Sequence, residues 1–442
     1  MRARRRPAGG RKRLLGRLSR RSARVGVIGL GYVGLPLSVE FAKAGFRVTG
    51  FEVDPKRVRT LNRGESHIQD VPARDVRELV RRGLFHATLD FDELRQMDVI
   101  DICVPTPLRK TKDPDVSFIV AAVSEIAARL RRGQLVVLES TTYPGTTEEL
   151  LRPMLERGGF SCGKDFFLAF SPERVDPGNP TYHTRNIPKV VGGVTSDCTS
   201  IATALYAAVM DKVVPVSSPQ VAEMVKLLEN TFRSVNIGLV NEIALLSDKL
   251  GLDVWEVIDA AATKPFGFMP FYPGPGLGGH CIPIDPFYLS WKARQSGFEA
   301  RFIELAGQVN GNMPFHVAGR VREALNARRQ AIRGSRILVL GVAYKPEIND
   351  VRESPALDLI EILEREGALV DYCDPYVPSL NYGGRPRRSK PFRPATLRAP
   401  DCVVIITPHR AFDFGLVARH ARSIVDSRNA LKGKRRRGVY RL

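Results

Sequence analysis

The sequence predicts an α/β protein with two doubly wound domains and a central α-helical domain that joins them. Three observations support this fold class. Strand and helix patterns alternate over the first half of the chain, helical periodicity alone continues from residue 221 to about residue 325, and the alternation restarts at Arg336. Alternating β and α segments are typical of parallel sheets covered by helices, so both end domains are expected to be Rossmann-like.

The changes in pattern also place the domain boundaries. We expect a disordered basic arm over residues 1–22, a first doubly wound domain over residues 23–212, a helical domain over residues 213–325 and a second doubly wound domain over residues 326–442. A chain of 442 residues is long enough for this, since single domains mostly contain about 100–200 residues.

The composition is typical of a globular protein in a reducing compartment. Hydrophobic residues make up 43% and charged residues 26% of the chain. No apolar run reaches about 18 residues, so no membrane span is expected. The six cysteines are scattered without a CxxC pair, which favours the cytoplasm and predicts neither disulfides nor a metal site.

The positive charge is concentrated at the N-terminus. Of the formal net charge of +20, eleven positive charges and no acid fall within residues 1–24, so the remaining residues carry about +9. A basic arm of this kind can bind nucleic acid or an anionic membrane surface. A disordered tail, or residues translated from an upstream start codon, is the preferred interpretation. Nucleic-acid binding is not expected, because the arm has no aromatic residue to stack on bases.

The first doubly wound domain begins with a βαβ unit. An apolar strand over residues 23–31 precedes a helical stretch over residues 33–44 and a second strand over residues 48–53. Further apolar strands are expected at residues 99–104 and 135–139. Together these segments predict a parallel sheet that continues to about residue 210.

The turn after the first strand carries the pattern GxGxxG. Gly29, Gly31 and Gly34 form it, and Glu52 follows about 20 residues later at the end of the next strand. In this context the glycines allow a tight turn, close approach of a pyrophosphate and close packing of helix on strand. Glu52 is placed to accept hydrogen bonds from a ribose and to repel a 2′-phosphate. The sequence therefore predicts NAD binding in preference to NADP.

Two polar residues follow apolar strands at the edge where doubly wound sheets bind their ligands. Thr142 lies in the segment ESTTYPG, and Glu173 lies in FSPER. Thr142 is a candidate to hydrogen-bond a water molecule or a substrate hydroxyl, and Glu173 is a candidate general base. Taken alone, either residue fits a cap or a turn better.

Helical patterns at residues 222–250, 254–262 and 286–311 make up the central domain. Lys226 and Asn230 are four residues apart on the first of them, so their side chains share a face. A lysine and an amide together are suited to stabilise an oxyanion. The alternative is an ordinary solvated helix face that carries a glutamate and a lysine.

A glycine- and proline-rich loop over residues 273–285 holds Cys281 near its end. Its four glycines leave few side chains in the way, so a ligand can approach the backbone and the thiol. Asp285 is expected to cap the next helix, with Pro286 at its first position. The positive end of that helix favours a thiolate, the reactive form. Cys281 is therefore the candidate nucleophile, against the alternative of a small buried cysteine beside a turn.

The last domain repeats the alternation without a GxGxxG pattern. Its expected elements are three strands and a helix, at residues 337–342, 370–373, 403–407 and 354–366. Residues 380–398 are rich in Pro, Arg and Gly and are expected to form a surface loop. Lys345 and Arg352, in GVAYKPEINDVRES, are candidates to contact phosphates. This domain is expected to bind something other than a second dinucleotide.

In this order the motifs resemble those of the UDP-glucose/GDP-mannose dehydrogenase family, the NAD-dependent nucleotide-sugar 6-dehydrogenases. The resemblance covers residues 24–431 and rests on GLGYVGLPL, ESTTYPGTT, FSPER, EMVKLLENTF, GPGLGGHCIPIDP and GVAYKPEINDVRES. Residues 263–289 are most similar to the UDP-N-acetylglucosamine 6-dehydrogenases. Ile284 and Pro265 stand where UDP-glucose dehydrogenases commonly have a lysine and an arginine, which argues against UDP-glucose.

The resemblance implies roles for individual residues. Those implied in catalysis are Cys281, Lys226, Asn230, Asp285, Glu173 and Thr142. Those implied in NAD binding are Gly29, Gly31, Tyr32, Val33, Gly34, Glu52, Arg57, Thr106, Thr142 and Arg352. Those implied in binding a UDP-sugar are Glu173, Lys226, Asn230, Tyr272, Gly276, Gly278, Tyr344, Lys345 and Arg428.

The implied reaction is a four-electron oxidation of the C6 hydroxyl of a UDP-sugar to the uronic acid, with two NAD molecules used in succession. UDP-N-acetylglucosamine is the expected substrate. Cys281 adds to the aldehyde to form a thiohemiacetal, oxidation of this adduct leaves a thioester, and water assisted by Glu173 hydrolyses the thioester. The resemblance also implies at least a homodimer.

Other interpretations stay open. UDP-glucose or UDP-N-acetylmannosamine is the alternative substrate of the same reaction. A non-catalytic protein that binds nucleotide sugars or polyanions through the basic arm belongs to a different class. A single-step, two-electron dehydrogenase on the same first domain would be indifferent to loss of Cys281.

Overall fold

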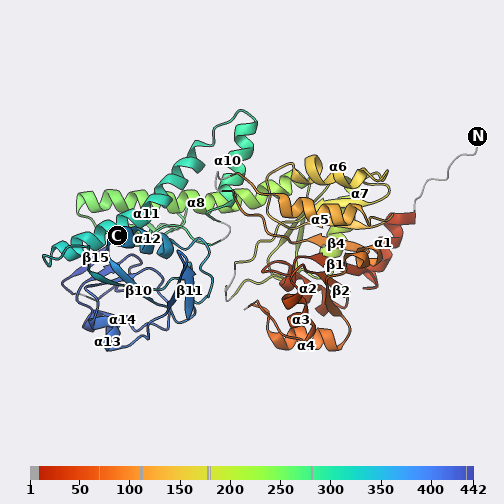
Figure 1. Cartoon of the computed structure of the whole chain (residues 1–442). Coiled ribbons are helices and arrows are strands. Elements are labelled where there is room, and N and C mark those ends of the chain that lie inside the picture. Colours follow the sequence, from red (N-terminus) through yellow and green to blue (C-terminus); the bar gives the residue numbers. More distant parts are fainter. Residues whose placement is uncertain are drawn as a thin grey trace, which may run out of the picture. The chain divides into compact units, whose positions relative to one another are not determined.

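The computed structural model describes residues 9–68, 70–109, 113–176, 179, 181–279, 282–434 and 436–442. The chain forms two compact units. The first contains residues up to 229 together with 291–296, and the second contains residues 230–290 and 297–442. Figure 1 shows a β-sheet with helices in each unit. Two helices, α8 (Pro219–Leu250) and α10 (Asp285–Gln295), contain residues of both units.

The first unit is built on an eight-stranded sheet with the strand order β3-β2-β1-β4-β5-β6-β7-β8. The order 3-2-1-4-5-6 of its first six strands is that of dinucleotide-binding folds. Its strands are β1 (Arg24–Ile28), β2 (Arg47–Phe51), β3 (Phe85–Thr88), β4 (Val99–Ile102), β5 (Leu135–Leu138), β6 (Phe167–Phe170), β7 (Lys189–Gly193) and β8 (Val213–Val216).

One pair of strands departs from the predicted parallel sheet. β6 and β7 are antiparallel, whereas every other neighbouring pair of this sheet is parallel. A parallel connection needs a crossover, usually a helix. The described residues between β6 and β7 contain no helix, so the chain returns in the opposite direction.

Helices cover both faces of this sheet. Successive side chains of a strand point to opposite faces, so Leu135 and Val137 join one apolar cluster while Val136 and Leu138 join the other. This explains why the strands are apolar throughout. The helical segments are α2 (Gly34–Lys43), α3 (Pro55–Asn62), α4 (Ala73–Arg81), η1 (Phe91–Gln96), α5 (Ser117–Ala127), the π-helical turn η2 (Thr146–Leu151), α6 (Arg152–Glu156) and α7 (Ser196–Tyr206).

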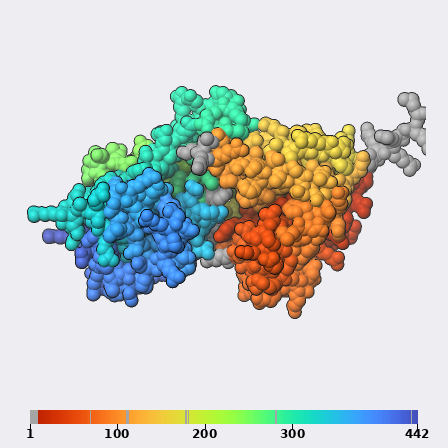
Figure 2. Space-filling model, viewed as in Figure 1, coloured from red at the N-terminus to blue at the C-terminus, as the bar shows by residue number. Residues whose placement is uncertain are grey.

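A further helix, α1 (Gly9–Ser19), precedes β1, so the prediction of a disordered arm over residues 1–22 is wrong for this part. Residues 1–8 lie outside the described residues. Leu14 and Leu18 share one face of α1 and are buried in the first apolar cluster, where α1 packs on α7. Two buried leucines thus anchor a segment whose composition is strongly basic. Figure 2 shows α1 in dark red at the edge of the first unit.

The second unit contains a five-stranded parallel sheet with the order β10-β9-β13-β14-β15. Counted along the chain without the separate hairpin of β11 (Ser379–Tyr382) and β12 (Arg385–Arg388), this is the order 2-1-3-4-5, the other common doubly wound arrangement. Its strands are β9 (Arg336–Leu340), β10 (Leu369–Cys373), β13 (Cys402–Ile405), β14 (Ile424–Asp426) and β15 (Val439–Arg441).

Helices again lie on both faces, since Ile337 and Val339 join one apolar cluster and Leu338 and Leu340 the other. Besides the parts of α8 and α10, the helices of this unit are α9 (Val254–Ala261), α11 (Arg301–Asn326), α12 (Pro355–Arg365), α13 (Pro394–Arg398) and α14 (Phe414–His420). The cluster that contains Ile337 and Val339 includes side chains of α11 and α12, and the cluster that contains Leu338 and Leu340 includes side chains of α13 and α14.

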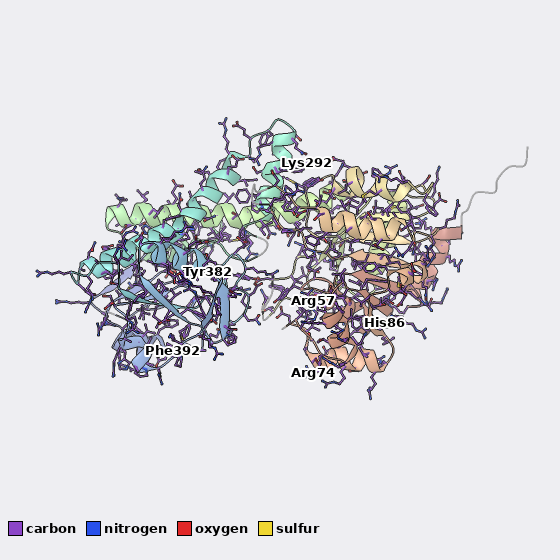
Figure 3. All side chains as sticks on the ribbon, viewed as in Figure 1. Arg57, Arg74, His86, Lys292, Tyr382 and Phe392 are labelled. Carbon is purple, nitrogen blue, oxygen red and sulfur yellow. The ribbon has the colours of Figure 1, made fainter. Side chains whose placement is uncertain are left out.

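Two expectations for this unit need correction. The predicted surface loop at residues 380–398 contains most of a hairpin, β11 (Ser379–Tyr382) with β12 (Arg385–Arg388), and all of α13. Tyr382, labelled in Figure 3, ties the hairpin to α12 through a 2.9 Å hydrogen bond from its hydroxyl to Glu361. The predicted helix over residues 286–311 is two helices, because the chain turns at Gly297 with φ +73°.

Candidate active site

The glycine turn after β1 lies at the point where the strand order of the first sheet reverses, between β1 and β4. Gly29 has φ +89°, and a Cβ on it would lie 2.6 Å from the carbonyl oxygen of Cys103, just after β4. A Cβ on Gly34 would lie 1.8 Å from the carbonyl oxygen of Gly29, so α2 packs against this turn only with glycine there. A Cβ on Gly31 would meet nothing within 4 Å. Gly29 and Gly34 are therefore required for close packing, whereas the space beside Gly31 is open.

Glu52 stands beside this turn at the end of β2 and is only 5% exposed. Its Oε1 accepts hydrogen bonds from the backbone N–H groups of Val53 (2.9 Å) and Asp54 (3.2 Å), and its Oε2 accepts one from Leu30 in the glycine turn (3.4 Å). Arg57 on α3, labelled in Figure 3, places Nη1 3.5 Å from Oε2. Backbone N–H groups thus fix the position of this carboxyl group next to the turn.

These features fit the adenosine and pyrophosphate parts of NAD. The open side of Gly31 faces no atom, the turn leads into the N-terminus of α2, whose dipole attracts an anion, and Glu52 stands where the ribose would lie. Tyr32 is 41% exposed, and Val33 packs partly on the first apolar cluster. Thr106 follows β4 on the same edge of the sheet and is buried.

Thr142 follows β5 on the same edge and is buried, with its hydroxyl 2.6 Å from that of Thr146. The segment after it is held from two sides. Trp291 at the C-terminal part of α10 packs on Tyr143 with ring centroids 4.8 Å apart. Lys292, labelled in Figure 3, pairs with Glu149 at 2.7 Å.

Glu223 on α8 holds the same segment from inside the unit. Its carboxylate accepts hydrogen bonds from the backbone N–H groups of Gly145 (2.6 Å) and Thr147 (2.9 Å) and from the Thr147 hydroxyl (2.6 Å). Glu223 is fully buried, and Lys226 and Asn230 are 7% and 4% exposed. The alternative of an ordinary solvated helix face is therefore wrong, because three helix positions with polar side chains face the protein interior.

Glu223 also predicts a pH dependence of stability. Burial raises the pKa of Glu223 from 4.5 to about 6, although its three hydrogen bonds act to lower it. The folded state then holds its proton more tightly than the unfolded state, so this contribution is complete below pH 4.5 and is lost as the pH rises to about 6. The loss amounts to about 2 kcal/mol.

Glu223→Gln is expected to remove this contribution. Across this pH range the free energy of unfolding of the wild type should fall by about 2 kcal/mol relative to that of the variant, measured by denaturant titration. Glu149→Gln changes an exposed glutamate close to the same turn and should keep the wild-type dependence. Parallel curves for wild type and Glu223→Gln would contradict the assignment.

Glu173 follows β6, and its carboxylate is held at both oxygens. Oε1 accepts hydrogen bonds from the backbone N–H groups of Arg174 (2.7 Å) and Val175 (2.9 Å), and Oε2 lies 3.5 Å from Lys189 Nζ. Its side chain keeps an exposed fraction of 13%. Lys189 was not among the residues predicted from sequence. Its only signal is a lysine at the start of a strand that is otherwise apolar.

In the second unit, Asn230 on α8 donates a 2.5 Å hydrogen bond to Asp285, the first residue of α10. Both side chains are buried, which brings together two residues that are 55 positions apart in the chain. Lys226 lies one helical turn before Asn230 on α8. His280 and the predicted nucleophile Cys281 lie outside the described residues.

The glycine loop before Cys281 packs on the segment after β9. A Cβ on Gly278 would lie 2.6 Å from Cβ of Tyr344 and 2.9 Å from the carbonyl oxygen of Glu353. Gly279 N–H donates a 3.1 Å hydrogen bond to the carbonyl of Arg352. A Cβ on Gly276 would lie 3.1 Å from Pro355. The glycines therefore allow two backbone segments to lie side by side at the carboxyl ends of the strands.

Arg428 follows β14 at this edge. A Cβ on Gly274 would lie 2.4 Å from Arg428 Nη1, and Arg428 Nε donates a 3.2 Å hydrogen bond to the carbonyl of Ile406 after β13. Burial lowers the pKa of Arg428 to about 10. No carboxylate of the described residues forms an ion pair with it. An anionic ligand would supply the guanidinium with the partner that these residues do not provide.

The second unit also contains four other residues that were predicted to bind the substrate or the cofactor. Tyr344 and Lys345 begin the segment after β9, and Arg352 forms a bidentate pair with Asp350 at 2.6–3.0 Å. Tyr272 lies at the start of the glycine loop. It stacks on Trp255 with ring centroids 5.8 Å apart and donates a 2.9 Å hydrogen bond to Asp259, which directs its hydroxyl toward α9.

A dinucleotide site at the switch point of one doubly wound unit, with an uncompensated arginine at the ligand edge of another, defines a dinucleotide-dependent enzyme with a second, anion-binding domain. The chain matches the UDP-glucose/GDP-mannose dehydrogenase family in three stretches: its NAD binding domain over residues 23–210, its central domain over residues 220–312 and its UDP binding domain over residues 338–433.

Similar proteins cover at least 80% of the chain. UDP-N-acetyl-D-mannosamine dehydrogenase of Pyrococcus horikoshii is 36% identical over 92% of this chain and 96% of its own length. UDP-N-acetyl-D-glucosamine 6-dehydrogenase of Pseudomonas aeruginosa is 37% identical over 80% of this chain and 83% of its own length. A solved structure of the UDP-D-ManNAc dehydrogenase from Pyrococcus horikoshii has a TM-score of 0.86 at 34% identity and covers 95% of this chain and 98% of that one.

The chain belongs to the UDP-glucose/GDP-mannose dehydrogenase family. It is an NAD-dependent nucleotide-sugar dehydrogenase, and the predicted cofactor, enzyme class and fold class are confirmed. Within the part of the chain that the structure describes, no helix is long and apolar enough to cross a bilayer.

Proposed function

We propose that this enzyme oxidises the C6 hydroxyl of a UDP-N-acetylhexosamine to the uronic acid, with Cys281 as the nucleophile. The observation that supports this most is the packing of the glycine loop that precedes Cys281 on Tyr344 and beside Arg428. A loop that carries a candidate nucleophile thus lies against the residues proposed to bind UDP. Arg428 and Lys345 are suited to the diphosphate, and Tyr344 to the uridine.

Bound NAD supplies the hydride acceptor for both oxidations. Cys281 attacks the C6 aldehyde, and the resulting oxyanion is stabilised by the ammonium of Lys226 and the amide of Asn230. Asp285 accepts a hydrogen bond from Asn230 and so orients that amide. Glu173 then takes a proton from the water that hydrolyses the thioester, and Thr142 contributes to binding of this water.

The acetylated sugar is proposed from the relatives and from residues 263–289. Relatives named for UDP-N-acetyl-D-mannosamine and UDP-N-acetyl-D-glucosamine are 36% and 37% identical to this chain. These sugars differ only in the configuration at C2, so both are candidates. UDP-N-acetylglucosamine is our first choice, because residues 263–289 are most similar to that branch of the family.

A panel of UDP-sugars tests the proposal. We expect one UDP-N-acetylhexosamine to be turned over with two NADH formed per sugar, and UDP-glucose to react with a kcat/KM at least about 10-fold lower, because the acetamido contacts are lost. NADH absorbance and the mass of the sugar product measure both quantities. One NADH per sugar would indicate a two-electron dehydrogenase, and no NADH with any sugar would leave a binding protein.

We also propose that the enzyme is a homo-oligomer that acts in the cytoplasm. Exposed apolar side chains recur every four or seven residues on α8, and their exposed fractions are 45–56%: Leu228, Phe232, Leu239 and Leu246. An apolar stripe of this kind on a helix is typical of a protein–protein interface. Light scattering of the purified enzyme measures its mass, and a monomer would contradict the first part of the proposal.

A further inference from the structure

A buried cluster of ionisable residues lies behind Glu173 in the first unit. Its four members are each at most 4% exposed: Asp101 on β4, Glu139 just after β5, Lys189 at the start of β7 and Tyr206 at the end of α7. No role is assigned to any of them by the reaction described above. Ionisable groups that are buried together in this way need partners, so the contacts among them define how their charges are arranged.

Lys189 is the centre of the cluster. Its ammonium lies 2.6 Å from Glu139 Oε2, 3.2 Å from the carbonyl oxygen of Pro172 and 3.5 Å from Glu173 Oε2. Three donors on one ammonium thus face two carboxylates and the backbone just before Glu173. The strand β7 carries Lys189 to this position because it runs beside β6, which Glu173 follows.

Tyr206 continues the chain of contacts away from Glu173. Its hydroxyl is hydrogen-bonded to Glu139 Oε1 and lies 3.1 Å from Asp101 Oδ1. A hydroxyl has one hydrogen and so donates to only one of these carboxylates. The other contact therefore needs a hydrogen from the carboxyl group itself, which means that one of the two acids is protonated.

The neutral acid is Asp101. Its Oδ2 is buried without a hydrogen-bond partner among the described residues, and burial together with the charge of Glu139 raises its pKa well above the usual range. Burial acts to lower the pKa of Lys189, but the carboxylates of Glu139 and Glu173 outweigh it and raise that pKa. The cluster thus holds one cation between two carboxylates, with Asp101 and Tyr206 neutral.

Among the described residues, Lys189 is the cation that forms an ion pair with Glu173. Arg174 is turned to Glu229 on α8, which it contacts through two nitrogens. Cys103, after β4, is neutral, because burial raises the pKa of its thiol well above the usual value. Glu139 repels a negative charge on Glu173, so the two carboxylates compete for the same ammonium.

We propose that Lys189 is a positioning residue for Glu173. Its ammonium orients the carboxylate of Glu173 toward the hydrolytic water, from which that carboxylate accepts a proton, and the series Asp101–Tyr206–Glu139 fixes the ammonium in place. This proposal rests on the proposed function, which assigns Glu173 as the acid/base group. In this step one proton moves from water to Glu173, and the residues of the cluster neither gain nor lose a proton.

Two substitutions with opposite expected effects test it. Lys189→Met should move the acidic limb of the kcat profile to higher pH, because a neighbouring cation favours an ionised carboxyl group. It should also lower kcat by about 10²-fold and leave KM for the UDP-sugar within about 2-fold, with acyl-enzyme accumulating in intact-protein mass spectra. Glu139→Gln removes the competing carboxylate, so it should move the same limb to lower pH.

Control variants separate positioning from folding. Lys189→Arg keeps the cation and should restore most of the activity and the wild-type profile. Lys212→Met removes an exposed lysine whose backbone carbonyl is hydrogen-bonded by Lys189, and it should change nothing. Shifts of Lys189→Met and Glu139→Gln in the same direction, or no shift in either, would overturn the proposal.

A measurement without substrate tests the charges. Asp101→Asn mimics a neutral carboxyl group and should keep a Tm within about 2 °C of the wild type, whereas Asp101→Leu should lose more, because it leaves the Tyr206 hydroxyl without that partner. If Asp101→Asn is as damaging as Asp101→Leu, the neutral acid is wrongly assigned and the proposal fails. If Asp101→Asn behaves as expected but the wild type forms no NADH with any UDP-sugar, the proposed function fails, and the role assigned to Glu173 fails with it.

Discussion

Replacing Cys281 by serine is expected to lower formation of the uronic acid by at least about 10³-fold. An aldehyde is a poor hydride donor until a nucleophile makes its carbon tetrahedral, and a serine hydroxyl is far less acidic than a thiol. The first oxidation does not need the thiol, so one NADH per enzyme can still form in a single turnover. Product mass spectrometry and NADH absorbance measure the two steps separately.

Cys162→Ser is the matched control for this substitution. Cys162 is a half-buried cysteine of the first unit that takes no part in the proposed reaction, so its replacement should leave turnover close to that of the wild type. Thermal unfolding of both variants shows whether either substitution affects folding. Full turnover by Cys281→Ser, with two NADH per sugar, would show that the proposed thioester chemistry is wrong.

Gly34→Ala is expected to abolish NAD binding and to lower the stability of the first unit by about 3 kcal/mol. The added Cβ would lie 1.8 Å from the carbonyl oxygen of Gly29, and backbone atoms cannot give way without moving α2 from β1. Both the dinucleotide turn and the first apolar cluster depend on this packing. Chemical denaturation measures the stability, and calorimetric titration measures the affinity for NAD.

Gly31→Ala is expected to separate binding from folding. Its Cβ would meet no atom within 4 Å, so the stability should stay within about 0.5 kcal/mol of the wild type. The methyl group would occupy the side from which the pyrophosphate approaches, so we expect the affinity for NAD to fall at least about 10-fold. Wild-type affinity in this variant, or wild-type stability in Gly34→Ala, would contradict the roles assigned to the glycines.

Local signals were sufficient for much of the first unit. The apolar run that enters GxGxxG predicts β1, the turn and α2, and Glu52 lies beside that turn as the fingerprint requires. These features depend on residues that are close in sequence, where strand propensity and the φ/ψ freedom of glycine act directly. The restart at Arg336 likewise predicts β9, which begins at that residue.

Non-local packing decided the elements that were predicted wrongly. The basic composition of residues 1–22 indicates disorder, yet two leucines of α1 are buried where this helix packs on α7. The hairpin at residues 379–388 has few apolar residues, and it is held by contacts such as that of Tyr382 with Glu361 on α12. Neither partner is near these segments in sequence, so composition alone misjudges them.

The candidate site shows the same division. Lys226 and Asn230 are visible as a pair from their helical spacing, but their burial is not, because a charged face next to Glu223 fits solvent equally well. Lys189 carries no motif at all. The role that we propose for it depends on β7 lying beside β6, which no pattern in the segment predicts.

By itself, the sequence determined the fold class, the NAD turn and the family, because these depend on short-range patterns and on motifs in a set order. The tertiary structure alone decided which charged residues are buried and which face each other. Burial of a charge is favourable only when a partner from another element stands within a few ångströms, and the chain brings such partners from distant positions. Glu223 and Lys189 are buried for this reason, and the glycines at 274–279 lie against Tyr344 and Arg428 through the same long-range packing.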